Sequence, residues 1–372
     1  MKRKTKLIQI LRSFSDTLQA ESQIKKAQYF VFLDEVQYAI STEELRSKDK
    51  CPRLYGVLNG LLHLGNADVY VTGSNSKLLS SDVMTEFRGR GDEIRVFPLS
   101  FSEFFAAKGG GDKEAALNEY AVYGGLPQVL QFKSEEDKGS YLKRLFDEAY
   151  FKDIVERNGI EREDAMAQLV DVLCSCTGSL ANTSKLSEAI NSANKSRISN
   201  PTVKSYVDFL KDSFLFSEAR RYDVRGKRYF DYQSKFYCID TGLRNARLNF
   251  RQIEFTHLME NLIYNRLIQK GFSVDVGMVP VSRRDDSGSL VRSQYEIDFV
   301  VNKGMHQYYI QSAFSIDDHE KKRKELYPFS IVNNSFRKII VTRSEISPFF
   351  DDDGIIHVGI VDFLLSDDIF SF

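Results

Sequence analysis

The sequence predicts a multidomain α/β protein, and three observations support this fold class. The chain has 372 residues, 42% of them hydrophobic, which is enough to bury cores in about two to four domains. Near its start, two short apolar runs flank a segment with helical spacing, the strand, helix and strand of a parallel sheet. The last third combines a long helical pattern with alternating strand-like runs, which indicates a separate α/β domain.

Composition restricts the class of protein further. Lys+Arg 51 against Asp+Glu 52 gives a net charge of -1, which argues against wholesale coating of nucleic acid but allows local basic patches. The four cysteines show neither disulfide-framework density nor Cys-x-x-Cys spacing, as expected in a reducing cytosol. The basic start is followed by too short an apolar run for a signal sequence, and no 18-residue apolar stretch occurs. We therefore expect a cytoplasmic protein without membrane contact.

The first part of the chain contains three runs of strand type. "YFVFL" (29–33) and "ADVYVT" (67–72) flank the helical pattern "LYGVLNGLLHL" (54–64). The third run is "EIRVFPLS" (93–100), and the glycine-rich "KGGGDK" (108–113) then indicates a loop and a domain boundary.

The rest of the chain alternates helical and mixed segments. Residues 114–158 are mostly helical around the turn "YGGLP", and residues 161–240 are predicted to form three helices and then two short strands. The last third has a helix at "THLMENLIYNRLIQKG" and strands at "YEIDFVV" and "QYYIQSAF", with further sheet material at "KIIVTRSE" and "IIHVGIVDFLL".

Two carboxylates follow the first strand directly. Asp34 and Glu35 end the run "YFVFL", and a buried strand delivers carboxylates to a sheet edge in this way around Mg²⁺-bound nucleotide. Such an aspartate holds Mg²⁺, and such a glutamate polarises the attacking water. The alternative is that both carboxylates merely end a strand where water is available.

Polar and basic residues follow the next strand. "TGSNSKLLSSD" places Asn75 beside those carboxylates if the two strands are neighbours, although each of its residues also favours turns. Arg88 and Arg90, flanked by glycines, suit the stabilisation of transition-state charge in trans, whereas loop arginines are most often simply solvated.

Four stretches in order, "FVFLDEVQ", "VYVTGSNSKLLSSD", "EFRGRGDEIRVFPLSFSEF" and "YGGLPQVL", resemble a known family. They are similar to prokaryotic AAA+ superfamily ATPases that carry a winged helix and a restriction-nuclease-like C-terminal domain. The resemblance implies that Asp34 is the Walker B aspartate that binds Mg²⁺, that Glu35 is the catalytic glutamate, that Asn75 is the sensor, and that Arg88 or Arg90 is the arginine finger.

The implied fold is a partial P-loop NTPase (AAA-type) parallel sheet, a helical lid, a winged helix and a PD-(D/E)XK nuclease-like α/β domain. The corresponding domain ranges are 1–112, 113–160, 161–240 and 241–372. The implied cofactors are ATP and Mg²⁺.

The chain departs from the family at the phosphate-binding loop. Family members place G-x-x-x-x-G-K-[ST] well upstream of the Walker B strand, where backbone N–H groups and the lysine hold the phosphates. The only Gly-Lys pair of this chain is Gly226-Lys227, and Arg228 follows it instead of Ser or Thr. We therefore expect a truncated, split or decayed ATPase that hydrolyses no ATP as given. A separate chain that supplies the loop, or a homo-oligomer, is then a possible partner.

The middle of the chain suggests a DNA contact. Two helices and a hairpin follow the order of a winged helix, and residues 195–235 hold ten Lys or Arg against five Asp or Glu, a local charge of +5. The candidate contacts to double-stranded DNA are Lys204, Lys211, Arg225, Lys227 and Arg228. The alternative is a winged helix that serves as a packing module with solvated charges.

The C-terminal third has a degenerate nuclease pattern. Glu260, Asp298 and Gln311 fall where the nuclease-like fold puts a helix glutamate, a strand aspartate and the glutamate of E-x-K. Gln311 replaces a carboxylate and Ala313 replaces the lysine, so we expect the fold without cleavage. Glu296 could replace a lost ligand, but the sequence suggests no lysine near it. The runner-up function is a non-enzymatic DNA-binding or protein-interaction module.

Overall fold

The structure, a computed structural model, describes residues 28–40, 44, 53–73, 91–193, 197–284, 289–315, 319–332, 335–366 and 368–370. The chain forms two compact units. The first ends at Arg95 and also includes Asp212–Phe214, and the second comprises the rest of the chain from Val96 onward. Each unit has hydrophobic cores of its own.

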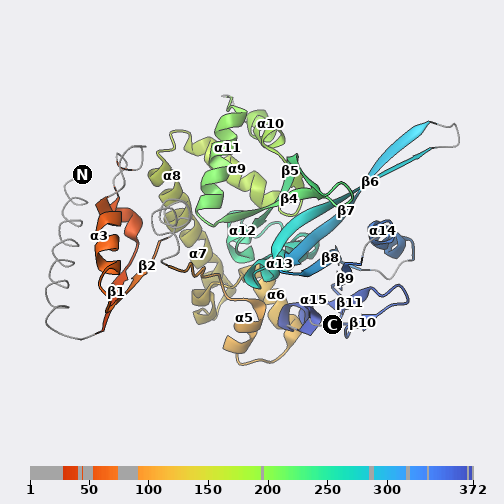
Figure 1. Cartoon of the computed structure of the whole chain (residues 1–372), viewed down its shortest axis with the longest axis horizontal. Coiled ribbons are helices and arrows are strands. Elements are labelled where there is room, and N and C mark those ends of the chain that lie inside the picture. Colours follow the sequence, from red (N-terminus) through yellow and green to blue (C-terminus); the bar gives the residue numbers. More distant parts are fainter. Residues whose placement is uncertain are drawn as a thin grey trace. The chain divides into compact units, whose positions relative to one another are not determined.

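The first unit contains the predicted strand, helix and strand. β1 (Tyr29–Leu33) pairs in parallel with β2 (Ala67–Val71), and α3 (Arg53–Leu62) lies between them in the chain (Figure 1). Val31 of β1 packs against Leu61 of α3 in a small apolar core. The prediction for these three elements is therefore confirmed.

One face of this two-stranded sheet exposes aromatic side chains. Successive residues of a strand point to opposite faces, so Phe30 and Phe32 lie opposite buried Val31 and are 59% and 73% exposed. Phe32 stacks on Tyr70 of β2 with ring centroids 5.0 Å apart. Parallel sheets are usually covered on both faces, which makes this face a candidate contact surface.

The prediction of a third strand over residues 93–100 is wrong. Residues 91–100 are irregular, and Ile94 and Val96 are 82% and 89% exposed. Its apolar spacing resembles that of a strand, but no strand among the described residues pairs with it. The segment ends at Ser100, whose side chain caps the helix that follows.

The predicted helical stretch and its glycine turn are present in the second unit. Gly125 of the turn donates its N–H to Asp240 Oδ2 at 2.7 Å, and a Cβ at this position would lie 2.2 Å from Leu99 O. Only glycine fits so close an approach. The helices of the second unit are α5 (Phe101–Ala107), α6 (Lys113–Tyr123), α7 (Glu135–Leu145), α8 (Lys152–Asn158), α9 (Glu163–Ser175), α10 (Thr183–Ala193), α11 (Asn200–Asp212), α12 (Thr241–Arg247), α13 (Phe255–Gln269), α14 (His319–Ser330) and α15 (Ile360–Leu365).

Within the described residues, the second unit is built on one mixed sheet in the order β10-β11-β9-β8-β7-β6-β4-β5-β3. The strands are β3 (Leu180–Ala181), β4 (Phe216–Asp223), β5 (Arg228–Cys238), β6 (Ser273–Arg284), β7 (Leu290–Lys303), β8 (His306–Ala313), β9 (Arg337–Thr342), β10 (Phe349–Phe350) and β11 (Ile356–Gly359). The helical and strand patterns predicted for 161–240 and for the start of the last third are present. Among the strands, β3, β6 and β10 were not predicted. The run "IIHVGIVDFLL", predicted as sheet material, is wrong in its second half, because the strand β11 ends at Gly359 and the chain continues as the helix α15.

The sheet joins parts of the chain that the sequence assigns to different domains. β4 pairs in parallel with β6, from Arg221 opposite Val276 to Asp223 opposite Met278. The sheet therefore continues across residue 240, one of the three predicted boundaries. Those boundaries, at residues 112, 160 and 240, remain predictions.

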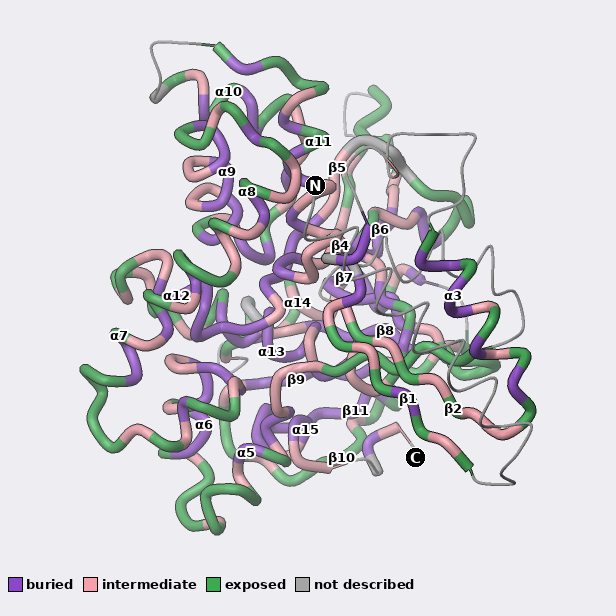
Figure 2. The backbone as a smooth tube through the Cα atoms, turned by 90° about the vertical axis from the view of Figure 1, so that its left-hand side faces the viewer, coloured by how far each residue is buried: buried purple, intermediate pink, exposed green. Residues whose placement is uncertain are grey.

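Two features of the second unit position the sites. α13 is buried along most of its length (Figure 2), so a charged residue on it is held inside the protein. β6 and β7 extend beyond their other partners as a two-stranded ribbon (Figure 1). No helix among the described residues combines the length and the apolar composition that crossing a membrane requires.

Candidate functional site

Four charged side chains from three elements meet inside the second unit. The Lys235 ammonium, from β5, lies 2.8 Å from Glu260 Oε1 on α13. On β7, Glu296 Oε1 lies 2.7 Å and Asp298 Oδ1 3.3 Å from the same nitrogen. We call these four residues the Lys235 cluster. One cation is thus surrounded by three oxygen atoms, each from a different carboxylate.

Other groups also hold two of these carboxylates in place. Lys235 and Tyr237 are two residues apart on β5 and therefore point to the same face. The Tyr237 hydroxyl donates to Glu260 Oε1 at 2.6 Å, and the Ser312 backbone N–H donates to Asp298 Oδ2 at 2.9 Å. The carboxylates are therefore oriented by hydrogen bonds that do not depend on the lysine.

The Lys235 cluster is largely closed to solvent. The exposed fractions of the side chains are 4% for Lys235, 15% for Glu260 and 10% for Asp298, against 34% for Glu296. On the side of Glu260 Oε2, a Cβ added to Gly178 would lie 3.1 Å away, so the backbone there closes the cluster. Glu296 is therefore the member of the cluster most accessible to solvent.

Burial and charge shift the pKa values of the cluster. Burial lowers the pKa of Lys235, but Asp298, Glu260 and Glu296 together more than reverse this and raise it above its ordinary value. Burial raises the pKa of Glu260 to about 7, with Asp298 adding to the rise and Lys235 opposing it. The two rises are compatible because three carboxylates share one ammonium and the surplus negative charge disfavours ionisation of buried Glu260. The ammonium itself stays charged.

Gln311 is occupied by structural contacts. Its Oε1 accepts the backbone N–H of Asp298 at 3.3 Å, and its Nε2 donates to Glu325 Oε2 on α14 at 3.0 Å. The predicted residues Glu260, Asp298 and Gln311 are thus brought together, with Gln311 linking β8 to α14. Among the described residues, no group of three or more His, Cys, Asp or Glu side chains is arranged to hold a metal ion.

Sequence reasoning missed Lys235. The expectation that no lysine lies near Glu296 is wrong, because Lys235 contacts it from β5. The available signal was a lysine followed directly by the apolar residues Phe236 and Tyr237 in a strand pattern, where an unpaired charge would be costly.

In the first unit, the two predicted catalytic carboxylates follow β1 as expected. The Thr72 hydroxyl, at the end of β2, donates to Asp34 Oδ1 and accepts the backbone N–H of Glu35 at 2.9 Å. Glu35 has a positive φ of 50°, which is uncommon for a residue other than glycine. Thr72 ties the two strand ends together and was not singled out from the sequence. Asn75, Arg88 and Arg90 lie outside the described residues.

The five basic candidates for DNA contact differ in their surroundings. Lys211 pairs with Glu218 at 2.5 Å, and Arg225 donates to the backbone oxygens of Pro280 and Ile331 at 3.0 and 2.7 Å. Both are therefore engaged in internal contacts. Arg225 is nevertheless exposed, as are Lys204, Lys227 and Arg228, the last at 3.6 Å from Asp223.

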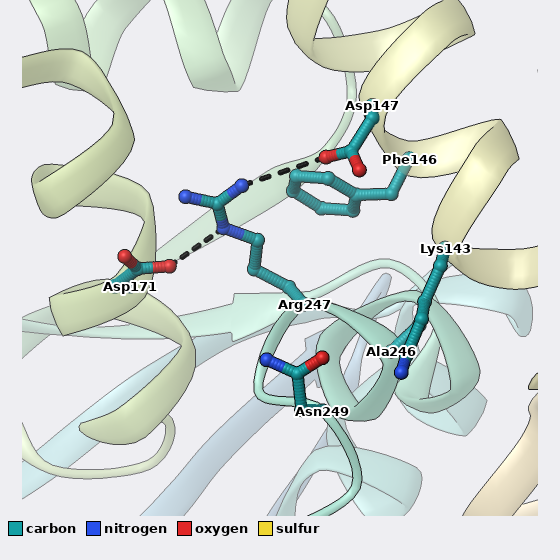
Figure 3. Close-up of a pocket in the computed structure, with 7 residues that line it drawn as sticks. All are labelled: Lys143, Phe146, Asp147, Asp171, Ala246, Arg247 and Asn249. Atoms are coloured by element: carbon teal, nitrogen blue, oxygen red, sulfur yellow. Dashed lines mark hydrogen bonds and ion pairs between the residues drawn. The ribbon is translucent and has the colours of Figure 1, made fainter. Parts of the chain in front are cut away.

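A hollow of about 270 Å³ lies between α7, α9 and α12 (Figure 3). Arg247 dominates it, with its guanidinium 2.6 Å from Asp171 and 3.5 Å from Asp147. The Phe146 ring lies 5.5 Å from the same guanidinium. Because two carboxylates already compensate the arginine, we assign this hollow no ligand.

Two family models each match a part of the chain. Residues 2–105 match the family model of an AAA domain. Residues 114–254 match a domain of unknown function, DUF8612. An AAA-like ATPase domain is thereby supported for the first of these ranges, which contains Asp34, Glu35 and Thr72.

Two curated proteins are similar to the chain, and both are described as uncharacterized. One, from Haemophilus influenzae, is 29% identical over 362 residues, which cover 95% of this chain and 82% of that protein. The other, from Methanocaldococcus jannaschii, is 26% identical over 293 residues, 76% of this chain and 62% of its own length. The crystal structure of the protein VC1899 from Vibrio cholerae aligns with 100% of this chain and with 81% of the VC1899 chain, at 13% sequence identity. The TM-score of 0.22 is too low to indicate a shared fold.

In the AAA domain, nucleotide and Mg²⁺ are the general expectation, and the described residues meet it only in part. Asp34 offers one carboxylate at a strand end, with one oxygen engaged by Thr72. The sequence holds no G-x-x-x-x-G-K-[ST] loop to hold the phosphates. The described residues of this range therefore supply one carboxylate for Mg²⁺ and no group for the phosphates.

Proposed function

We propose that this chain acts by binding rather than by catalysis. It is an AAA-type ATPase family protein that neither hydrolyses ATP by itself nor cleaves nucleic acid. The observation that carries this proposal is the Lys235 cluster, in which an ammonium lies among the carboxylates that a nuclease would use to hold metal. The ATPase half of the proposal rests on the missing phosphate-binding loop.

We assign the second unit to a winged helix followed by a restriction-nuclease-like fold. In favour of the winged helix, α9, β3, α10, α11, β4 and β5 follow one another in that order, and β3 pairs with β5. In favour of the nuclease-like fold, α13 is followed by β6, β7, β8, α14 and β9, with Glu260 on the helix and Asp298 on the second strand.

The non-cleaving character follows from what metal-dependent cleavage requires. Such enzymes need carboxylates free to bind Mg²⁺ and a lysine that positions the attacking water. Here the ammonium of Lys235 is 4% exposed and bound to all three carboxylates, so it is not available to a water or a phosphate. The side-chain amide of Gln311 donates a hydrogen bond to Glu325, and this position has no carboxylate that could bind a metal.

A second candidate function is duplex DNA binding. It is favoured by one stretch of exposed basic residues. Lys227 ends the turn between β4 and β5, and Arg228 begins β5. Val224, in the same turn, donates its N–H to Met278 O on β6 at 3.0 Å. The ribbon of β6 and β7 carries three further exposed basic residues, Arg283, Arg284 and Arg292. A two-stranded ribbon fits the major groove, and arginines bind phosphates and guanine edges.

Two partners are proposed for the AAA domain: a separate chain that supplies the phosphate-binding loop, or a second copy in a homo-oligomer, which would lack the loop as well. The aromatic face of Phe30, Phe32 and Tyr70 supports a contact of this kind, because exposed apolar faces on parallel sheets are unusual. Sedimentation of the pure chain at several concentrations would test self-association.

One experiment tests binding and cleavage together. The full chain is incubated with a labelled duplex and with supercoiled plasmid in Mg²⁺ buffer, and electrophoresis follows both substrates. The proposal expects a shifted duplex and an intact plasmid. A plasmid that is nicked at a rate proportional to protein concentration would contradict it.

A further inference from the structure

We propose that the Lys235 ammonium takes the place of a divalent cation in the Lys235 cluster, so that removing this one charge creates a metal site. The inference rests on the proposed function, because it explains why a cluster of three carboxylates does not serve metal-dependent cleavage. It goes further by naming the residue that excludes the metal and the class of ion that would replace it.

With the lysine present, these carboxylates are not arranged to hold a metal ion, but all three converge on its ammonium. Glu260, Glu296 and Asp298 each direct one oxygen at the same point, at 2.8, 2.7 and 3.3 Å from the lysine nitrogen. Oxygen ligands lie about 2.0–2.6 Å from Mg²⁺ or Ca²⁺, so binding a metal at that point needs inward shifts of roughly 0.5–1 Å. Side chains on a helix and a strand can make shifts of this size by small rotamer adjustments.

The oxygens would stay in place without the lysine. Tyr237 donates to Glu260, and the Ser312 N–H donates to Asp298, so two of the three carboxylates keep a partner that fixes their orientation. Glu296 is the most exposed of the three and opens the cluster to water, which could complete the coordination of an ion.

Charge favours the exchange once the lysine is gone. Three carboxylates around one ammonium carry a surplus of negative charge, and its removal leaves three buried or half-buried anions with no cation between them. Such a cluster must take up protons, open towards water or bind a cation. A hard divalent ion with oxygen preference suits it best.

A purely structural role for the lysine gives a different expectation. An ordinary buried ion-pair network loses stability when one partner is removed, and no metal restores it. The two readings therefore differ in whether a metal ion specifically rescues the variant that lacks the lysine.

The test uses the full chain with Lys235→Met, which keeps an unbranched side chain one heavy atom shorter and removes its charge. Mn²⁺ is the probe, because electron paramagnetic resonance measures free Mn²⁺ directly. We expect no bound Mn²⁺ in the wild type and about one bound ion per Lys235→Met chain. At about a hundredfold excess of Mn²⁺ over its Kd, Tm of the variant should rise by about 5 °C while that of the wild type stays constant.

Two controls assign the effect to the cluster. Lys185→Met removes an exposed lysine of α10 and should leave Mn²⁺ binding absent. Lys235→Met/Asp298→Asn removes one of the three oxygen ligands as an anion and should weaken Mn²⁺ binding by at least tenfold relative to Lys235→Met.

Two results with Lys235→Met would overturn the inference. A Lys235→Met protein that is folded and binds no Mn²⁺ overturns the inference, and so does one that stays unfolded at every Mn²⁺ concentration. The variant Lys235→Met/Glu260→Gln, with one buried charge fewer, should fold without metal and shows whether loss of folding comes from the carboxylates. Wild-type plasmid cleavage would instead overturn the proposed function, so the two failures are distinguishable.

Discussion

The ammonium of Lys235 lies 2.7 Å from the Glu296 carboxylate, although β4 and β6 separate their strands in the sheet. The contact depends on two long side chains that meet near the surface of α13. It links the hairpin of β4 and β5 to the ribbon of β6 and β7. The parts of the chain before and after residue 240 are therefore coupled by a buried charge cluster as well as by sheet pairing.

The linking role of Gln311 gives the first prediction. Replacing Gln311 by Glu puts a carboxylate where an amide now donates to Glu325 at 3.0 Å. The lost donor and the repulsion between two acids should lower the free energy of unfolding by about 1–3 kcal/mol at pH 7. Urea unfolding at pH 7 and again near pH 4 measures the effect, which should shrink in acid as the new carboxyl takes up a proton.

The matched control for this change is Gln307→Glu, four residues earlier on β8. Gln307 is exposed, so the free energy of unfolding should change by less than about 0.5 kcal/mol. Equal losses in both variants would mean that the bond from Gln311 to Glu325 contributes nothing specific.

The second prediction concerns pH and Asp240. This side chain accepts N–H bonds from Gly125 and Leu243, and burial raises its pKa from an ordinary 3.8 to about 6. Because the folded protein holds this proton more tightly than the unfolded chain, the stability from this group is present below pH 4 and is lost as pH rises to about 6.

Asp240→Asn removes that dependence. The difference in free energy of unfolding between wild type and variant should therefore fall by roughly 3 kcal/mol from pH 4 to pH 7 and stay constant above. Chemical unfolding at several pH values provides the measurement. A difference that is constant from pH 4 to pH 7 would show that Asp240 titrates at the same pH in both states.

The third prediction concerns nucleotide. This chain should not bind ATP in the micromolar range, because the triphosphate would lack the backbone cradle and lysine that provide its charge-assisted bonds. Titration calorimetry with ATP and Mg²⁺ should give only the heat of dilution. Tight Mg²⁺-dependent binding that Asp34→Asn abolishes would refute this expectation.

The fourth prediction concerns duplex DNA and salt. If Lys204, Lys227 and Arg228 each contact a phosphate, their joint replacement by Gln should reduce the slope of log K against log salt by about 2–3. Fluorescence anisotropy of a labelled duplex across a salt series measures the slope. Arg225→Gln serves as the comparison, because this arginine bonds to Pro280 and Ile331 and its loss should act mainly on stability.

The ribbon arginines extend the same series. Replacing Arg283, Arg284 and Arg292 together should lower the slope by a further 2–3 if the ribbon lies against the duplex. An unchanged slope would restrict the contact to the region of α11 and the hairpin. If no binding occurs at about 50 mM salt, DNA is not a partner and the second unit serves as a packing or protein-interaction module.

The elements predicted correctly are those whose signal is local. The strand at 29–33, the helix after it and the strand at 67–71 each show their own apolar period and need no distant information. The run at 93–100 shows the same kind of signal and forms no strand, since pairing depends on a neighbour that the run itself does not specify. β6 is a strand that the sequence did not predict, because Gly277 and Pro280 interrupt the alternation of apolar and polar residues.

The residues of the candidate site also differ in whether the local sequence reveals them. Glu260, Asp298 and Gln311 could be singled out from the sequence because the family resemblance suggested these positions, and their role stays a prediction. Lys235 could not, because its role arises from a contact between β5 and β7, which the period of neither strand reveals. Long-range pairing of charged side chains thus decides the chemistry of a site that local sequence can only outline.

The most direct test of the central claim is incubation of the pure chain with supercoiled plasmid in Mg²⁺ or Mn²⁺. Because Lys235 is bound to all three carboxylates of its cluster, we predict that the plasmid stays intact over hours at micromolar protein. Metal-dependent nicking by the wild type that disappears in Asp298→Ala would contradict the claim and establish the Lys235 cluster as a working nuclease centre.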